Sequence, residues 1–164
     1  MAYKSILTVL TTAADAALAI GSAARLARAQ DAHLDILVLG VDRTQLGYSY
    51  IGTGAVLMEV ALERAENEAR ETEAAVRAAL AAEADGLRWG LEAAVTQLGA
   101  LTELVAQRAR FADIVVLARP YGPGKGNESE AVVEAALFEG RVPVLVLPES
   151  GLATATTRRV VLAW

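Results

Sequence analysis

The sequence predicts an α/β fold, an open five-stranded parallel sheet with helices on both faces, of the Rossmann-like type. Short apolar segments rich in Val, Ile and Leu alternate along the chain with longer Ala- and Glu-rich segments of helical character. Several of the short segments are almost continuously apolar, as expected for parallel strands that helices cover on both faces. Such alternation builds a parallel sheet with right-handed crossovers.

The first half of the chain contributes two strands and a long loop. Ser5–Leu10 is a β-rich apolar run, and the two threonines that follow can cap a helix from about residue 14 to residue 29. Leu34–Val41 is the second predicted strand. The segment Asp42–Gly54 holds three glycines and two tyrosines, and a loop of this length can fold over a crevice or pack at a partner surface.

The middle of the chain predicts a long helix, an edge strand and a further helix. Residues 56 to about 84 are rich in Ala, Glu and Arg, with opposite charges at i,i+3 and i,i+4 spacings. Arg88–Gln97 alternates polar and apolar residues, which indicates a third strand near a sheet edge. A helix over 100–110 follows.

The stretch from Asp113 to Pro148 carries the functional question. We predict a strand at Asp113–Leu117, a glycine-rich turn at Gly122–Asn127, a helix at Ser129–Phe138 and an edge strand at Val142–Leu147. Ligands of open parallel sheets bind at the carboxyl ends of the strands. A glycine-rich turn that leads from a strand into a helix is a place where backbone N–H groups can cradle phosphate.

Composition excludes several classes of function. The chain of 164 residues suits one domain, and its net charge of −5 without a Lys/Arg cluster argues against nucleic-acid binding. It has no cysteine for disulfides or thiolate metal sites.

With a single histidine, His33, no nucleophile–base–orienter set is recognisable, so we expect no enzyme. No apolar run reaches the roughly 18 residues of a membrane span, and we expect a cytoplasmic protein.

Four segments carry a resemblance to a known family. They are the opening Tyr3–Leu7, the strand His33–Val38, and the ordered pair Ala112–Leu117 and Val142–Pro148. Together with the order of elements, they resemble the universal stress protein (UspA) family over residues 3–148. The resemblance implies an adenine nucleotide alpha hydrolase-like fold and a stress-response function. It also implies that the fifth strand pairs with its equivalent in a homodimer or between tandem domains.

The resemblance also implies where a nucleotide would bind. ATP-binding members have an acidic residue after the first strand. After the fourth strand they have a Gly-x-x-Gly motif, then nine further residues, then Gly-Ser or Gly-Thr. In this chain other residues occupy these positions. The acidic position falls near Leu10, the position of the first glycine near Ala118 or Arg119, and the Gly-Ser/Thr position at Glu130-Ala131. A carboxylate there would repel phosphate. We therefore predict a degenerate ATP-binding motif and no bound cofactor.

An alternative interpretation is an ATP- or AMP-binding member with a variant phosphate loop, in which Arg119 and Lys125 supply the positive charge. The site residues would then be Val41, Arg119, Gly122, Gly124 and Gly126. The competing interpretation of Arg119 is an ion pair with Glu128 or Glu130. A third possibility is another adenine-binding α/β subunit, similar to an electron-transfer flavoprotein.

The end of the chain suggests a tandem arrangement. We assign residues 3–149 to one universal-stress-type domain and residues 150–164 to a linker plus a strand. Arg158–Trp164 can be laid on Lys4–Leu10, because both have a basic or polar start followed by an apolar run. This is the pattern expected where a second such domain begins. The alternative is an ordinary strand added to the sheet.

Overall fold

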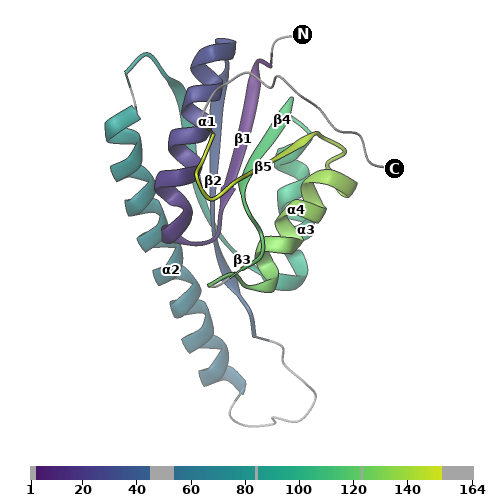
Figure 1. Ribbon diagram of the computed structural model, residues 1–164. Helices are drawn as coiled ribbons and strands as arrows, with labels where there is room; N and C mark the ends of the chain where they lie inside the picture. The colour runs from purple at the N-terminus through teal and green to yellow at the C-terminus, as the bar shows by residue number, and fades with distance from the viewer. Residues whose placement is uncertain (1–2, 45–53, 84, 123, 153–164) are drawn as a thin grey trace.

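The computed structural model describes residues 3–44, 54–83, 85–122 and 124–152. Within these residues, five parallel strands form one sheet in the order β3-β2-β1-β4-β5 (Figure 1). The strands are β1 (Ser5–Leu10), β2 (His33–Asp42), β3 (Arg88–Gln97), β4 (Ile114–Ala118) and β5 (Val144–Leu147). The helices are α1 (Ala16–Gln30), α2 (Gly54–Glu83), α3 (Leu98–Ala109) and α4 (Asn127–Glu134), which continues as a π-helical segment, Ala135–Glu139. The predicted fold class is confirmed.

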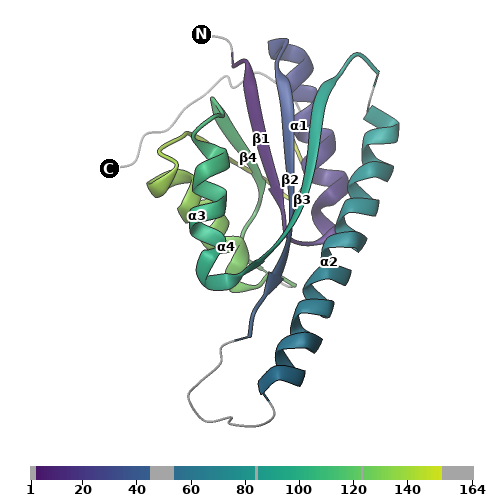
Figure 2. The ribbon, with the colours of Figure 1, turned by 180° about the vertical axis from the view of Figure 1, so that it is seen from behind.

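The sheet is sandwiched between two pairs of helices. In Figure 1, α1 and α2 lie over one face, and Figure 2 shows α3 and α4 over the other. Successive strand residues point to opposite faces, so Ile6 joins a core with Ile20 and Val76, whereas Leu7 joins a second core with Leu101. This two-sided burial explains why the inner strands are almost continuously apolar.

Close contact between β2 and α2 brings α2 alongside the carboxyl edge of the sheet. A Cβ atom at Gly40 would clash with the backbone carbonyl of Ala65 and lie 3.0 Å from the Cβ of Ala69. The helix therefore lies directly against the strand. The contact therefore places Arg64 and Glu68, the residues just before Ala65 and Ala69 in α2, beside the end of β2.

Most element boundaries agree with the sequence prediction. Helix α1 begins later than expected, because the hydroxyl of Thr12 accepts a hydrogen bond from the Ala14 N–H (3.4 Å) and caps a short 3-10 turn, Ala13–Asp15. β3 and β5 are the edge strands, as predicted. β5 is shorter than expected and begins at Val144, just after Pro143, which has no N–H to donate to a ladder.

Two predictions fall outside the described residues. The strand predicted at Arg158–Trp164 and most of its linker lie there, as does most of the loop Asp42–Gly54. The tandem arrangement therefore stays a prediction. Among the described helices, none combines the length and the apolar composition that a membrane span requires.

Candidate functional site

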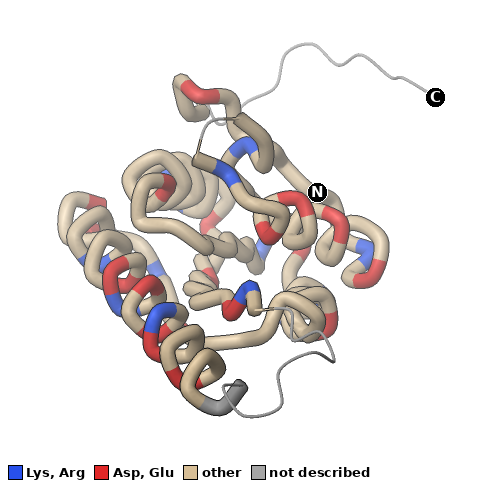
Figure 3. The backbone as a smooth tube through the Cα atoms, turned by 90° about the horizontal axis from the view of Figure 1, so that it is seen from below, with Lys and Arg blue, Asp and Glu red and all other residues tan. Residues whose placement is uncertain are grey.

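The carboxyl ends of β1, β2 and β4 meet at one edge of the sheet, where a cavity of about 540 Å³ opens. Its walls come from Thr11 and Thr12 after β1, Arg43 after β2, Arg64 on α2, and the loop that leads into α4. Figure 3 looks onto this edge, with positions of both charge signs alternating along α2. We refer to this cavity as the carboxyl-edge crevice. It lies where ligands of open parallel sheets bind.

Arg43 spans the crevice between two carboxylates. Its Nη2 donates a hydrogen bond to Glu128 Oε1 at 2.7 Å, and its Nη1 donates to Glu68 Oε2 at 2.8 Å. The Glu128 side chain is 8% exposed and the Arg43 side chain 39% exposed, so the carboxylate of this ion pair is shielded from water while the guanidinium is partly accessible. The two carboxylates raise the pKa of Arg43 still further above its ordinary value. These three residues, the Arg43 bridge, connect β2 with α2 and α4.

Glu128 lies at the amino end of α4, where a phosphate would be expected. Its carboxylate folds back over Gly126, the residue that precedes the helix, so closely that a Cβ atom at Gly126 would collide with it. The hydrogen bond from Arg43 holds the pKa of Glu128 below its usual range, and its own backbone N–H acts in the same direction. A carboxylate at this end of a helix is favoured by the helix dipole. The protein thus places its own anion in the anion-binding position.

The other basic groups around the crevice are also paired. Lys125 forms an ion pair with Asp15, and the two side chains are 16% and 19% exposed. Arg64 Nε donates to Glu68 Oε1 at 3.0 Å. Arg43, Arg64 and Lys125 are the three basic residues that line the crevice. Each of them is already matched with a carboxylate.

The five predicted site residues are divided among neighbouring cavities. Gly124 and Gly126 line the carboxyl-edge crevice. Val41 is buried and lines an adjoining cavity of about 350 Å³ together with Arg43. Arg119 and Gly122 line a smaller cavity of about 110 Å³ beside the end of β5. The structure therefore does not gather all five residues around one cavity, and their role as a nucleotide site stays a prediction.

The ion pair expected between Arg119 and Glu128 or Glu130 is wrong. Arg119 is paired with Glu149, donates to the Tyr121 carbonyl at 3.1 Å, and lies 5.5 Å from the Tyr121 ring centroid. The reason is the pairing of β4 with β5, which aligns Ala118 with Leu147 and so brings the residues after both strands together. Glu128 is satisfied by Arg43 instead.

Sequence reasoning missed Arg43 and Glu68 as crevice residues. The signal that could have found Arg43 is its position directly after a parallel strand, since residues at such strand ends converge on one edge. Asp42, its neighbour, does not pair with it. The Asp42 carboxylate instead accepts a hydrogen bond from the Thr44 N–H at 2.8 Å. Glu68 carried no comparable signal, because it lies among many similar residues of α2.

No family model matches the sequence, and neither does any curated protein sequence. Solved structures do match. The universal stress protein UspA from Lactobacillus plantarum is similar with a TM-score of 0.62 and 21% identity, over 90% of this chain and 99% of that chain. The fold is that of the universal stress proteins. A universal stress protein family structure from Burkholderia pseudomallei also matches, with a TM-score of 0.51 and 20% identity, over 89% of this chain and 96% of that chain.

The resemblance inferred from Tyr3–Leu7, His33–Val38 and the segment pair in the second half of the chain is thereby confirmed for the fold.

Proposed function

We propose that this protein is a cytoplasmic universal-stress-type domain that catalyses no reaction and whose nucleotide crevice is filled by its own carboxylates. It would act by pairing with a second such domain. The Arg43 bridge is the observation that carries the proposal. Where a nucleotide-binding domain needs unpaired positive charge and accessible N–H groups, this chain has Arg43 held between Glu68 and Glu128.

The cost of admitting a phosphate group supports this proposal. A nucleotide phosphate could reach Arg43 and the amino end of α4 only by displacing the Glu128 carboxylate. That carboxylate would then be left buried without a partner, or α4 would have to move. Leaving the Glu128 carboxylate without its partner costs about 1–3 kcal/mol, which offsets the gain from a single new phosphate contact.

Calorimetric titration with Mg-ATP and with AMP tests the proposal. We expect no saturable binding tighter than about 1 mM for the wild-type chain. The informative variant is Glu128→Gln, which removes the charge that repels phosphate, and Glu130→Gln is the matched control on the same helix turn. Glu128→Gln should bind ATP more tightly than Glu130→Gln does. Wild-type affinity near about 10 μM would refute the proposal.

The second candidate function is ATP or AMP binding through a variant loop. The observation that favours it is the crevice itself, which contains Gly124, Gly126 and Ser129 close to Arg43 and Lys125. In that case wild-type protein would bind ATP, and Arg43→Met would abolish binding. Equal ATP affinity in wild type, Arg43→Met, Lys125→Met and Arg119→Ala would remove this candidate, because these three side chains are the basic groups that it assigns to the phosphate.

Pairing through the segment Val142–Leu147 is the remaining part of the proposal. Within the described residues, β5 has a neighbouring strand on one side only. Val146 is 38% exposed, and Leu137 and Phe138 in the preceding π-helical segment are also exposed. An edge strand with exposed apolar side chains favours addition of another strand. The partner is either a second copy or a tandem domain.

A further inference from the structure

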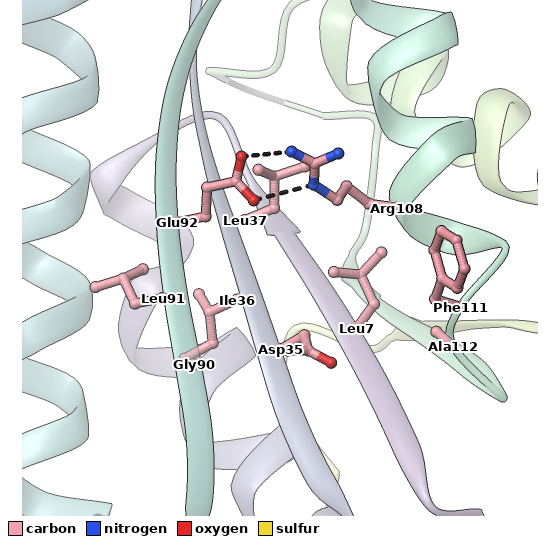
Figure 4. A pocket seen from close by; sticks show the side chains of 10 residues that line it. All are labelled: Leu7, Asp35, Ile36, Leu37, Gly90, Leu91, Glu92, Arg108, Phe111 and Ala112. Carbon is pink, nitrogen blue, oxygen red and sulfur yellow. Dashed lines mark hydrogen bonds and ion pairs between the residues drawn. The ribbon is translucent and has the colours of Figure 1, made fainter.

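A second cavity lies on the sheet face over β2 and β3, away from the carboxyl edge. In Figure 2, α3 and α4 stand to one side of this part of the face, and no described helix crosses in front of it. The cavity has a volume of about 330 Å³ and lies between β2, β3 and the end of α3 (Figure 4). None of its lining residues is shared with the carboxyl-edge crevice. Its size is at the lower end of the range for small-molecule sites.

The interior of this sheet-face cavity is apolar. Leu7 and Leu37 point into it from β1 and β2, and the ring of Phe111 stands at its wall (Figure 4). Phe111 is 84% exposed, so its ring is available to a ligand. Gly90 on β3 has no side chain to fill the space. Leu7 and Leu37 form the floor of the cavity and are only 3% and 1% exposed, so the apolar surface open to a ligand comes mainly from the Phe111 ring, which suits a flat apolar group.

The charges on the side chains that line this cavity do not sum to zero. Glu92 and Arg108 neutralise each other through two hydrogen bonds, Oε1 to Nη2 at 2.6 Å and Oε2 to Nε at 3.0 Å. Asp35 instead contacts the hydroxyl of Ser5 at 3.4 Å and the ring of His33 at 3.3 Å. The hydroxyl is uncharged, and His33 is positive only when it is protonated. Among the described lining residues, one negative charge therefore remains, on Asp35.

We infer that the sheet-face cavity is a binding site for a small organic cation with a flat apolar body. The ammonium group would lie at the Asp35 carboxylate, and the apolar body would lie beside Gly90 and rest against the exposed ring of Phe111. Charge complementarity selects a cation over an anion of the same shape. The apolar lining selects a ring-bearing amine over a bare metal ion.

Methyl-detected NMR of the 164-residue chain, with three probes of similar shape and different charge, tests this inference. The probes are tryptamine, the uncharged 3-ethylindole and the anionic indole-3-propionate. We expect tryptamine to shift the methyl signals of Leu7 and Leu37 saturably, with an affinity about fivefold higher than that of 3-ethylindole, as expected for one partly exposed ion pair. Indole-3-propionate should bind most weakly.

Two variants and a control locate the site. Asp35→Asn should reduce the affinity for tryptamine to that for 3-ethylindole. The matched control is Asp42→Asn at the opposite end of β2, which should leave the affinity for tryptamine unchanged. Gly90→Ala should weaken all three probes, because its Cβ would lie at ordinary contact distance, 3.5 Å, from Asp35 Oδ1 and His33 Nε2 and would enter the cavity without distorting the strand.

Three outcomes would overturn the inference. The first is the absence of saturable shifts at Leu7 and Leu37 up to about 10 mM tryptamine. The second is equal affinity for tryptamine in wild type and Asp35→Asn. The third is a set of shifts confined to the carboxyl-edge crevice, which would place the ligand elsewhere.

Discussion

Arg43 and Glu128 are 85 positions apart in the sequence, and a hydrogen bond of 2.7 Å joins them across the carboxyl-edge crevice. One follows β2 and the other begins α4. Their contact gives a buried carboxylate the partner that it requires. It also places negative charge at the amino end of α4.

Removal of the Glu128 side chain should destabilise the protein. We expect Glu128→Ala to lower the free energy of unfolding by about 1–3 kcal/mol, because Arg43 loses a shielded partner and the end of α4 loses its carboxylate. Glu130→Ala is the matched control. Glu130 is exposed on the same helix turn, and its removal should change the free energy by no more than about 0.5 kcal/mol. Urea denaturation followed by circular dichroism measures both, and equal effects would contradict the prediction.

The contribution of Glu128 should disappear in acid. Its pKa is lowered in the folded protein, so folding favours the deprotonated form. The stabilisation is therefore present above the ordinary glutamate pKa of about 4.3 and is lost as the pH falls through the lower, folded-state value. We expect the difference in unfolding free energy between wild type and Glu128→Gln to be largest near neutral pH and to shrink below about pH 4. A difference that stays constant or grows in acid would contradict this expectation.

A methyl group at Gly40 should separate β2 from α2. Its Cβ would clash with the Ala65 carbonyl, which belongs to the helix backbone and cannot rotate away. We expect Gly40→Ala to cost about 1–3 kcal/mol in unfolding free energy. Gly99→Ala in α3 is the control, since a Cβ there meets no atom within 4 Å. That change should be neutral or stabilise by up to about 1 kcal/mol through helix propensity, and a similar loss in both variants would rule out the close-contact explanation.

Charge at the β5 edge should prevent the proposed pairing. Val146 on β5 and Val95 on β3 are both 38% exposed and lie on opposite edge strands of the same sheet. A lysine on an edge strand opposes the addition of another strand. By light scattering coupled to size-exclusion chromatography, we expect wild type and Val95→Lys to be dimers and Val146→Lys to be a monomer. A monomeric wild type, or a dimer in Val146→Lys, would show that β5 does not mediate homodimer formation.

The elements themselves were predictable from the sequence because their signals are local. Arg88–Gln97 is β3 with the predicted bounds, and the alternation of polar and apolar residues correctly indicated an edge position. The glycine-rich turn before α4 was also predicted correctly. Two glycines of that turn, Gly124 and Gly126, line the crevice.

By itself, the sequence determined the parallel α/β fold and the place of the glycine-rich turn between β4 and α4. Each of these follows from residue order or from periodicity over a few neighbours. Only the tertiary structure decided which charges meet: Arg43 with Glu128 rather than Arg119, and Arg119 with Glu149. Those pairings depend on strand order and register, which join residues distant in the chain and have no signature in local sequence.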